Sequence, residues 1–396
     1  MKKKILSLSL GLIISFSTFG IANAETREDI CAYRTEDALS YNENIGKRYN
    51  DFDSVIVVNA YSIDSDGLSA SGLVGAANGV ICPVVNGEGA EVVEKYLNGD
   101  TYKTVYFIGG PDVISNNLKR DIADMGYSCK SIYGKNRIET SYKVAEEIER
   151  LTGDVNEIAI TRAYKGEADA ANISFEARNR KMPIILTNGQ SVPFNTDGVT
   201  TYAIGGTSVI SNSLVNSTGA IRIGGSNRYE TNRKVIEYFN RTENSEYTLV
   251  FGHDVTYAIL SSCIKDGSPV VLISENSNKD ILYGANRLKY VFFFAEDLSY
   301  YIRAACSNAT YAKGAVDAMN AIYRQTGDSR KNTFYMYNQY NSYVSALDNF
   351  EYYNKNFYIF NIVDDLGDEA DSNFLVRKSD KKLFVYYPGM SKPIAY

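Results

Sequence analysis

The sequence has very little histidine, and this scarcity bears on the classes of enzyme to which it could belong. His253 is the only histidine among 396 residues, and no His-x-x-x-His or His-x-x-Glu-His pair occurs. Zinc amidases and peptidases generally hold their metal with two or three histidines, so the sequence disfavours both classes. It also contains no Gly-x-Ser-x-Gly nucleophile elbow and no Walker phosphate loop. We predict no catalytic residue, no metal site and no cofactor.

A cysteine–histidine hydrolase is disfavoured by position. Such a site would have to join His253 to Cys263, ten residues further along the chain. We expect His253 directly after a strand and Cys263 in the helix that follows, so the two side chains should not meet. A carboxylate pair for glycoside cleavage can come from any part of a fold, and the sequence leaves that class open.

Cysteine is scarce as well, with five residues and no Cys-x-x-Cys pair. No disulfide framework can be read from this number and spacing, although one or two bridges remain open. Cys82 and Cys263 lie inside apolar runs, where a buried and unreactive thiol is usual. Tryptophan is absent, whereas 32 tyrosines suit a hydrogen-bonding, carbohydrate-rich setting.

Long hydrophobic runs are absent except near the amino terminus. Residues 5–20 are mostly apolar, follow three lysines and precede Ala22-Asn23-Ala24, which fits a small-x-small cleavage pattern. We predict that residues 1–24 are a signal peptide cleaved after Ala24, and that the protein is secreted. No second run is long enough to span a bilayer, so we expect no membrane partner after cleavage.

Basic residues are in the minority. Cleavage removes three of the 41 Lys and Arg residues and leaves 38 against 47 acidic residues, a net charge near −9. This balance argues against an acidic membrane surface and against nucleic acid, and we predict no nucleic-acid partner. A polyanion can bind a chain of this charge only where its basic groups are clustered.

A recurring segment gives the clearest sign of how the chain is organised. Residues 134–140 read Gly-Lys-Asn-Arg-Ile-Glu-Thr and residues 225–231 read Gly-Ser-Asn-Arg-Tyr-Glu-Thr, with a weaker copy at 34–37. In each copy the arginine lies 21 residues before an apolar run; the pairs are Arg34 and Val55, Arg137 and Ile158, and Arg228 and Leu249. Constant spacing in three copies indicates tandem modules.

Short apolar strands alternate with helices in each module, which is typical of parallel sheets covered on both faces. We predict an α/β fold divided as follows: signal peptide 1–24, module 1 at 25–136, module 2 at 137–227, module 3 at 228–311 and a small α+β region at 312–396. Module 3 is degenerate, because Ala295-Glu296 stands where the other modules have Gly-Gly.

The region 312–396 leaves two questions open. It is either a separate domain or an elaboration packed on module 3. Its acidic loop at 364–371 is either a calcium site or a solvated loop, and the lack of EF-hand spacing favours the solvated loop.

Two features of the modules are candidates for anion binding. The turns Gly109-Gly110 and Gly205-Gly206 each follow a strand and precede a helix, where free backbone N–H groups favour an anion. The alternative is that these glycines only permit a tight turn. The repeated arginine could likewise clamp an anion, or it could bridge modules while the Glu and Thr after it cap a helix.

The repeats resemble those of a known family. Residues 204–211 (Ile-Gly-Gly-x-x-x-Ile-Ser), 222–231 (Arg-Ile-Gly-Gly-Ser-Asn-Arg-Tyr-Glu-Thr) and 183–187 (Pro-Ile-Ile-Leu-Thr) are similar to the cell wall-binding repeat type 2 family of clostridial surface proteins, which includes S-layer proteins. The resemblance spans about residues 27–311. It implies three open α/β modules, Rossmann-like or toprim-like, that form a pseudo-trimer and bind an anionic secondary wall polymer non-covalently.

Carried over residue by residue, the resemblance implies candidate polymer-binding residues beside the module interfaces: Arg34, Arg137, Arg228, Ile184, Ile185, Leu186, Val271, Leu272 and Ile273. The expected partner is an anionic secondary cell-wall glycopolymer, with S-layer proteins as a second class of partner. We predict a non-enzymatic protein of the cell wall or S-layer surface that displays residues 312–396. The alternatives are a wall-modifying enzyme or a surface adhesin whose activity lies in this C-terminal region.

Overall fold

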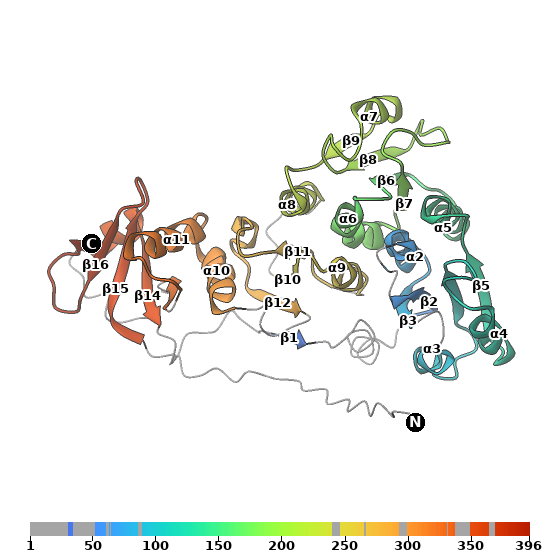
Figure 1. Ribbon diagram of the computed structural model, residues 1–396, viewed down its shortest axis with the longest axis horizontal. Coiled ribbons are helices and arrows are strands. Elements are labelled where there is room, and N and C mark those ends of the chain that lie inside the picture. Colours follow the sequence, from blue (N-terminus) through green and yellow to red (C-terminus); the bar gives the residue numbers. More distant parts are fainter. Residues whose placement is uncertain are drawn as a thin grey trace, which may run out of the picture.

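The computed structural model describes the following residues: 31–34, 52–60, 63, 65–85, 89–239, 246–264, 267–292, 299–330, 332–336, 349–363 and 369–396 (Figure 1). The predicted signal peptide, the Ala295-Glu296 pair and most of the acidic loop lie outside them. The described strands form three parallel sheets of four strands and one antiparallel sheet of five. The predicted α/β class is confirmed.

The first parallel sheet has the strand order β3-β2-β4-β5. Its strands are β2 (Ser54–Asn59), β3 (Gly79–Val84), β4 (Thr104–Ile108) and β5 (Ser128–Ile132). Helices cover both faces: Ile56 packs toward α2, whereas Val57 packs toward α3 and α4. These elements are η2 (Asp66–Ser69), α2 (Ala70–Ala76), α3 (Ala90–Leu97) and α4 (Asn116–Asp124). Burial on both faces explains the continuous apolar runs.

The second sheet repeats this order as β7-β6-β8-β9. Its strands are β6 (Glu157–Arg162), β7 (Ile184–Thr187), β8 (Thr200–Ile204) and β9 (Ile221–Ile223). Its helices are α5 (Arg137–Thr152), α6 (Glu167–Arg180) and α7 (Asn212–Thr218). Gly153 ends α5 with a positive φ of 88°, a conformation that glycine adopts without the Cβ penalty.

The third sheet has the order β1-β12-β10-β11 and draws one strand from the start of the chain. Its strands are β1 (Cys31–Arg34), β10 (Glu246–Phe251), β11 (Val270–Ile273) and β12 (Arg287–Phe292). Its helices are α8 (Arg228–Phe239), α9 (Val255–Ser262), η3 (Asp280–Leu282) and α10 (Tyr300–Tyr311). The strand that the sequence grouped with module 1 therefore pairs in parallel with β12, in the sheet of module 3.

Arg34 lies in a strand, unlike the other two repeated arginines, and the residues after it, which were expected to open a helix, lie outside the described ranges. It is the last residue of β1, where pairing with Phe292 of β12 keeps the backbone extended. Arg137 and Arg228 do begin helices, as predicted.

Three helices, one from each module, pack together at the centre of the module region (Figure 1). A single core joins apolar residues from one face of all three sheets to α2, α6 and α9. The approach is close, because a Cβ added at Gly75 of α2 would lie 1.9 Å from the Arg178 carbonyl oxygen of α6. The thiol of Cys263, which follows α9, donates to the Ser71 hydroxyl of α2 at 3.4 Å. The three modules form one packed body.

The C-terminal region packs onto the third module. Its elements are α11 (Ala315–Thr326), β13 (Thr333–Met336), α12 (Phe350–Asn356), β14 (Phe357–Val363), β15 (Glu369–Arg377), β16 (Leu383–Tyr386) and β17 (Ile394–Ala395). One core contains Phe251 of β10, Met319 of α11 and Phe360 of β14. The region is therefore an elaboration built on module 3, with its own antiparallel sheet. Among the described helices, none combines the length and apolar character needed to cross a membrane.

Candidate functional site

The repeated segment folds in the same way at both well-preserved copies, and its polar residues organise the start of a helix. Asn136 Oδ1 accepts from the backbone N–H of Glu139 at 3.1 Å, and Asn227 Oδ1 accepts from that of Glu230 at 3.0 Å. The two glutamates reach back to the residue before the cap, and Glu139 Oε2 accepts from the Lys135 N–H. This is a helix-capping arrangement, so Asn and Glu recur for a structural reason.

The glycine and threonine of the segment close the same turn. Thr140 Oγ1 accepts from the Gly134 N–H at 3.1 Å, and Thr231 Oγ1 accepts from the Gly225 N–H at 3.0 Å. A Cβ at Gly134 would come within 2.2 Å of Glu139 Cβ, and one at Gly225 within 2.5 Å of Glu230 Cβ. Only glycine fits such a close approach.

Arg137, at the boundary of modules 1 and 2, is largely engaged by the protein. Its Nη1 donates to the Ala163 carbonyl at 2.9 Å and lies 3.4 Å from Glu167 Oε1. Its guanidinium also stacks over the ring of Tyr164, 4.6 Å from the centroid. The side chain is 19% exposed. These contacts tie the start of α5 to the loop after β6.

Arg228, at the boundary of modules 2 and 3, makes the equivalent backbone contact but is exposed. Its Nη1 donates to the Gly252 carbonyl at 2.6 Å, and this is the guanidinium's one hydrogen bond among the described residues. Among the described residues, Arg228 has no ion pair like the one that joins Arg137 to Glu167. The remaining donors of Arg228 thus face solvent at the start of α8.

The Gly-Gly turns lie over two buried carboxyl groups that the sequence analysis missed. A Cβ at Gly109 would stand 3.6 Å from Asp66 Oδ2, and one at Gly205 would stand 2.7 Å from Asp169 Oδ2. Both aspartates lie seven residues after the end of the first strand of their module, a recurrence that the sequence does contain. Each carboxyl also faces the arginine that opens the next module.

Burial governs the ionisation of both carboxyl groups. It raises the pKa of Asp66, against the lowering effects of the Thr140 hydrogen bond and the Arg137 charge. It raises the pKa of Asp169 to about 7, although the Arg228 charge opposes the rise and Glu167 adds to it. Removal of a carboxylate from water favours its neutral form, and here this effect exceeds the attraction of the arginine.

The backbone of the Gly-Gly turns is used within the fold. The Gly109 N–H donates to the Ile132 carbonyl at 3.2 Å, and the Gly205 N–H donates to the Ile223 carbonyl at 2.9 Å. Gly109 and Gly205 have φ angles of 135° and 123°, which favour glycine. The tight-turn reading of Gly109-Gly110 and Gly205-Gly206 thus has a structural basis, and their anion-binding role stays a prediction.

The six apolar candidates lie inside the protein. Their exposed fractions do not exceed 4%; they are Ile184, Ile185 and Leu186 of β7 and Val271, Leu272 and Ile273 of β11. Both strands lie at a sheet edge, where their backbone accepts contacts from side chains of the helix that opens the module. The Leu186 N–H donates to Ser141 Oγ of α5, and the Leu272 N–H donates to Asn232 Oδ1 of α8. These residues hold the strand ends in place.

The possible cysteine–histidine pair does not form. His253 is 65% exposed and lies 3.5 Å from Asp254 Oδ1, whereas Cys263 is buried against Ser71. Burial raises the pKa of the Cys263 thiol to about 11, which leaves it protonated and unreactive at neutral pH. The described residues also contain no group of three or more His, Cys, Asp or Glu side chains placed to hold a metal ion.

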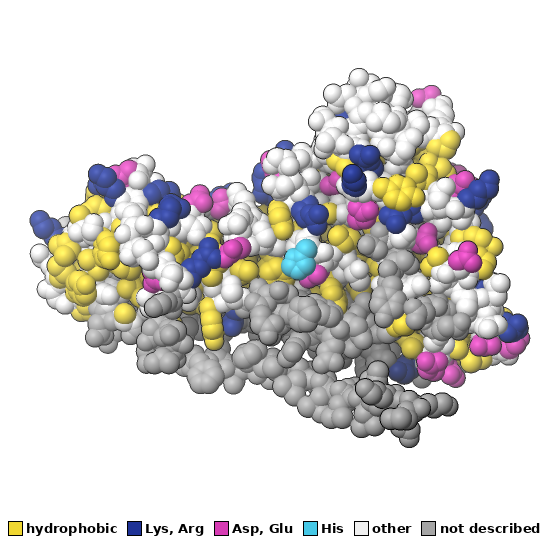
Figure 2. Space-filling model, in the orientation of Figure 1, with side chains coloured by type: hydrophobic (Ala, Val, Ile, Leu, Met, Phe, Trp, Pro, Cys, Tyr) yellow, Lys and Arg dark blue, Asp and Glu magenta, His cyan; other side chains and the backbone are white. Residues whose placement is uncertain are grey.

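Basic side chains gather in the central part of the module region. Figure 2 shows several Lys and Arg side chains over α6 and beside α8, with acidic side chains among them. The fold and the site together define an α/β repeat protein with an arginine at a helix start on each of two module boundaries. Arg137 is held by neighbouring protein groups, whereas Arg228 is exposed to solvent.

Comparisons with known proteins agree with this class. Residues 131–215 match the family model of Cell wall binding domain 2 (CWB2). N-acetylmuramoyl-L-alanine amidase LytC of Bacillus subtilis (strain 168) is 31% identical over 153 residues, which are 37% of this chain and 30% of LytC. Residues 131–215, within the region where the repeats pointed to this family, are thus similar to a cell wall binding domain of the CWB2 type.

Two solved structures share the fold. Cwp6 from Clostridium difficile aligns with a TM-score of 0.61 at 23% identity, over 75% of this chain and 50% of Cwp6. Cwp8 from Clostridium difficile aligns with a TM-score of 0.57 at 21% identity, over 70% of this chain and 51% of Cwp8. The chain thus spans about half the length of these structures and less than a third of LytC. Its cell wall binding module supports association with the cell surface.

Proposed function

We propose that the three modules anchor this protein non-covalently to the cell wall by binding an anionic secondary wall polymer, chiefly at the boundary of modules 2 and 3. The observation that carries the proposal is the exposure of the Arg228 guanidinium. It donates one hydrogen bond to the Gly252 carbonyl, and its other N–H groups face solvent. A guanidinium binds phosphate or carboxylate through two parallel hydrogen bonds, which suits a polyanionic chain.

The position of Arg228 adds to its suitability. It is the first residue of the 12-residue helix α8, where the helix dipole also favours negative charge. His253 is exposed and adjoins Gly252, the residue whose carbonyl holds Arg228. A polymer that crossed this boundary would meet both side chains.

The other candidates have secondary roles in this proposal. Arg137 supplies charge but is held by Ala163, Glu167 and Tyr164, so it binds polymer less strongly than Arg228. Arg34 would contribute at the boundary of modules 3 and 1, where β1 joins the third sheet. The buried residues of β7 and β11 shape the boundaries without touching polymer.

The protein as a whole is proposed to be a secreted, non-enzymatic wall protein. The modules would fix it to the wall, beside S-layer proteins as further partners, while residues 312–396 are displayed. LytC is named as an amidase, but this chain corresponds to 30% of its length. That likeness therefore gives no reason to extend the activity to this chain.

Co-sedimentation with purified walls tests the proposal. The mature protein should pellet with walls and should stay in solution once acid extraction has removed the phosphate-containing polymer. Binding should weaken as salt rises, because each neutralised phosphate releases counterions. Arg228→Ala should weaken binding, whereas Arg120→Ala, at an exposed arginine of α4, should not. Undiminished binding to extracted walls would refute the polymer as the ligand.

A further inference from the structure

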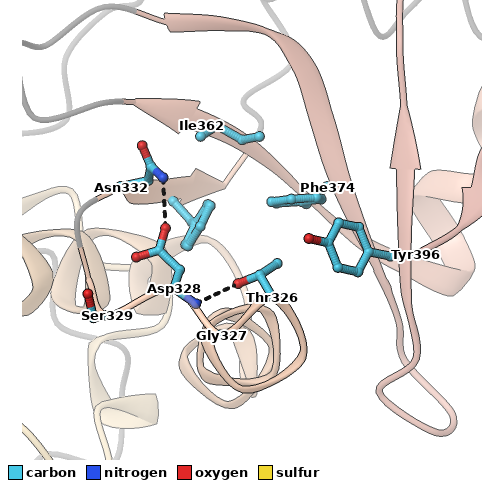
Figure 3. Close-up of a pocket in the computed structure, with 9 residues that line it drawn as sticks. Thr326, Gly327, Asp328, Ser329, Asn332, Ile362, Phe374 and Tyr396 are labelled. Atoms are coloured by element: carbon cyan, nitrogen blue, oxygen red, sulfur yellow. Dashed lines mark hydrogen bonds between the residues drawn. The ribbon is translucent and has the colours of Figure 1, made fainter.

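The C-terminal region contains a pocket that the wall-anchoring proposal does not use. It has a volume of about 400 Å³ and lies between the end of α11, the loop that follows it, and strands β13 to β15 (Figure 3). The described residues that line it all come from α11 or later in the chain. A volume of this size is within the range of small-molecule sites in proteins.

Aromatic rings form one side of the pocket. The ring centroids of Phe334 and Phe374 are 5.6 Å apart, and those of Phe374 and Tyr396 are 5.7 Å apart with an interplanar angle of 86°. Phe334 and Phe374 belong to the core, with 1% and 8% exposure, whereas Tyr396 is 64% exposed. The aromatic side of the pocket therefore consists of two buried rings and one exposed ring, that of Tyr396.

Polar groups line the opposite side. Asn332 Nδ2 donates to Asp328 Oδ2 at 2.7 Å, and the Asp328 N–H donates to Thr326 Oγ1 at 3.2 Å. Figure 3 shows the Tyr396 hydroxyl directed into the pocket, toward the side on which Asp328 and Asn332 lie. The two hydrogen bonds hold the carboxyl and amide groups in position at the rim.

We propose that this pocket binds a neutral pyranose sugar. A pyranose has a face of C–H groups, which suits the electron-rich face of an aromatic ring, and a rim of hydroxyls, which suits carboxylate and amide oxygens. The Asp328 carboxylate would repel an anionic sugar at this short range. Arg330, two residues further along the chain, pairs with Glu275 and stacks over Tyr301.

The site is distinct from the one proposed for wall anchoring, in both place and ligand charge. The polymer site would use arginine and an anion, and this pocket would use aromatic rings and a neutral ring. The sugar could belong to the wall itself or to a glycan of another cell. The chemistry of recognition is the same in both cases.

Saturation-transfer NMR with methyl β-glucopyranoside, N-acetylglucosamine and glucuronate tests the pocket in the full mature chain. We expect ring protons of at least one neutral sugar to be saturated, with affinity in the millimolar range and weaker binding of glucuronate. Tyr396→Ala should lower the affinity about three- to tenfold, because the open aromatic edge is lost. Tyr102→Ala, at a tyrosine that is 97% exposed in module 1, is the matched control and should leave it unchanged.

Asp328→Asn provides a second readout that general loss of structure would not produce. Without the carboxylate charge, the preference for the neutral sugar over glucuronate should shrink or vanish. Arrays of wall-derived fragments and of glycans from other cells would identify the source, and binding to either would support the pocket. Absence of binding to every neutral sugar, or equal effects of Tyr102→Ala and Tyr396→Ala, would overturn the proposal. Wall binding by these variants reports separately on the anchoring site.

Discussion

The two well-preserved module boundaries share one motif but leave their arginines in different states. In both, Asn caps the helix, Glu completes the cap, Thr closes the turn and Arg donates to the carbonyl after the next strand. At the first boundary Glu167 and Tyr164 also hold the guanidinium. At the second boundary Arg228 has no such ion pair or ring contact among the described residues, and it is exposed. The recurring motif therefore has a structural role at both boundaries. We expect ligand binding at the boundary where the arginine keeps N–H donors in solvent.

The largest effect should come from disrupting the close packing of α2 against α6, at the boundary of modules 1 and 2. In Gly75→Ala the new Cβ would stand 1.9 Å from the Arg178 carbonyl oxygen, a backbone atom that cannot rotate away. We expect a loss of about 3 kcal/mol in the free energy of unfolding, well above the roughly 1 kcal/mol that alanine gains in a helix. Urea unfolding measures this.

Gly110→Ala is the control for this substitution. The nearest atom to its Cβ would be Tyr133 Cδ2 at 3.6 Å, an ordinary contact. Its unfolding midpoint should stay close to that of the wild type. Equal midpoints for Gly75→Ala and the wild type would show that α2 and α6 are not packed as described.

The next largest effect should come from the buried carboxyl at the second boundary. Because the folded pKa of Asp169 is about 7 and its unfolded value is about 3.9, the folded state holds an extra proton between these values. Stability should therefore fall as pH rises from about 4 to about 7, and the cost should be complete above that range. Asp169→Asn should remove the fall and make the protein more stable than the wild type near pH 8.

Thermal unfolding across this pH range measures the effect. Asp66→Asn should change stability in the same direction but by less, because Thr140 and Arg137 both lower the pKa of Asp66. Parallel stability curves for the wild type and Asp169→Asn would mean that this carboxyl is ionised throughout.

A third effect separates the two arginines by function. Arg228→Ala should lower wall affinity about tenfold, the loss of about 1.4 kcal/mol expected for a charge-assisted hydrogen bond, with little change in stability. Arg137→Ala should lower stability and change wall affinity little, because the Arg137 guanidinium bonds to Ala163 and stacks over Tyr164. Sedimentation and thermal unfolding of both variants at one ionic strength provide the comparison. Equal losses of affinity would contradict the distinction between the two boundaries.

The sequence predicted most of the module fold because the signals there are local. The apolar runs that lie 21 residues after the repeated arginines form β2, β6 and β10, one strand in the parallel sheet of each module. It did not predict that β1 completes the third sheet. Pairing of Cys31 with Lys289 joins residues far apart in the sequence, and no local pattern encodes it.

The candidate site could be predicted only in part for a related reason. The recurrence of Arg137 and Arg228 is visible in the sequence, but their exposure depends on loops more than 20 residues away. The buried state of Asp169 likewise depends on the Gly205 turn above it. The apolar runs at β7 and β11 were recognised as strands, but their complete burial is a result of packing between modules.

The smallest effect should be the same at both boundaries. Asn136→Ala and Asn227→Ala each remove a side-chain oxygen that accepts backbone N–H groups at a helix start. Loss of such a cap costs about 1 kcal/mol, so thermal unfolding should show similar decreases in stability. Neither variant should change wall affinity once folded, because the two side-chain oxygens are already bonded to backbone N–H groups of their helices. A selective loss of wall binding in Asn227→Ala would mean that the motif itself, and not the open arginine, carries recognition.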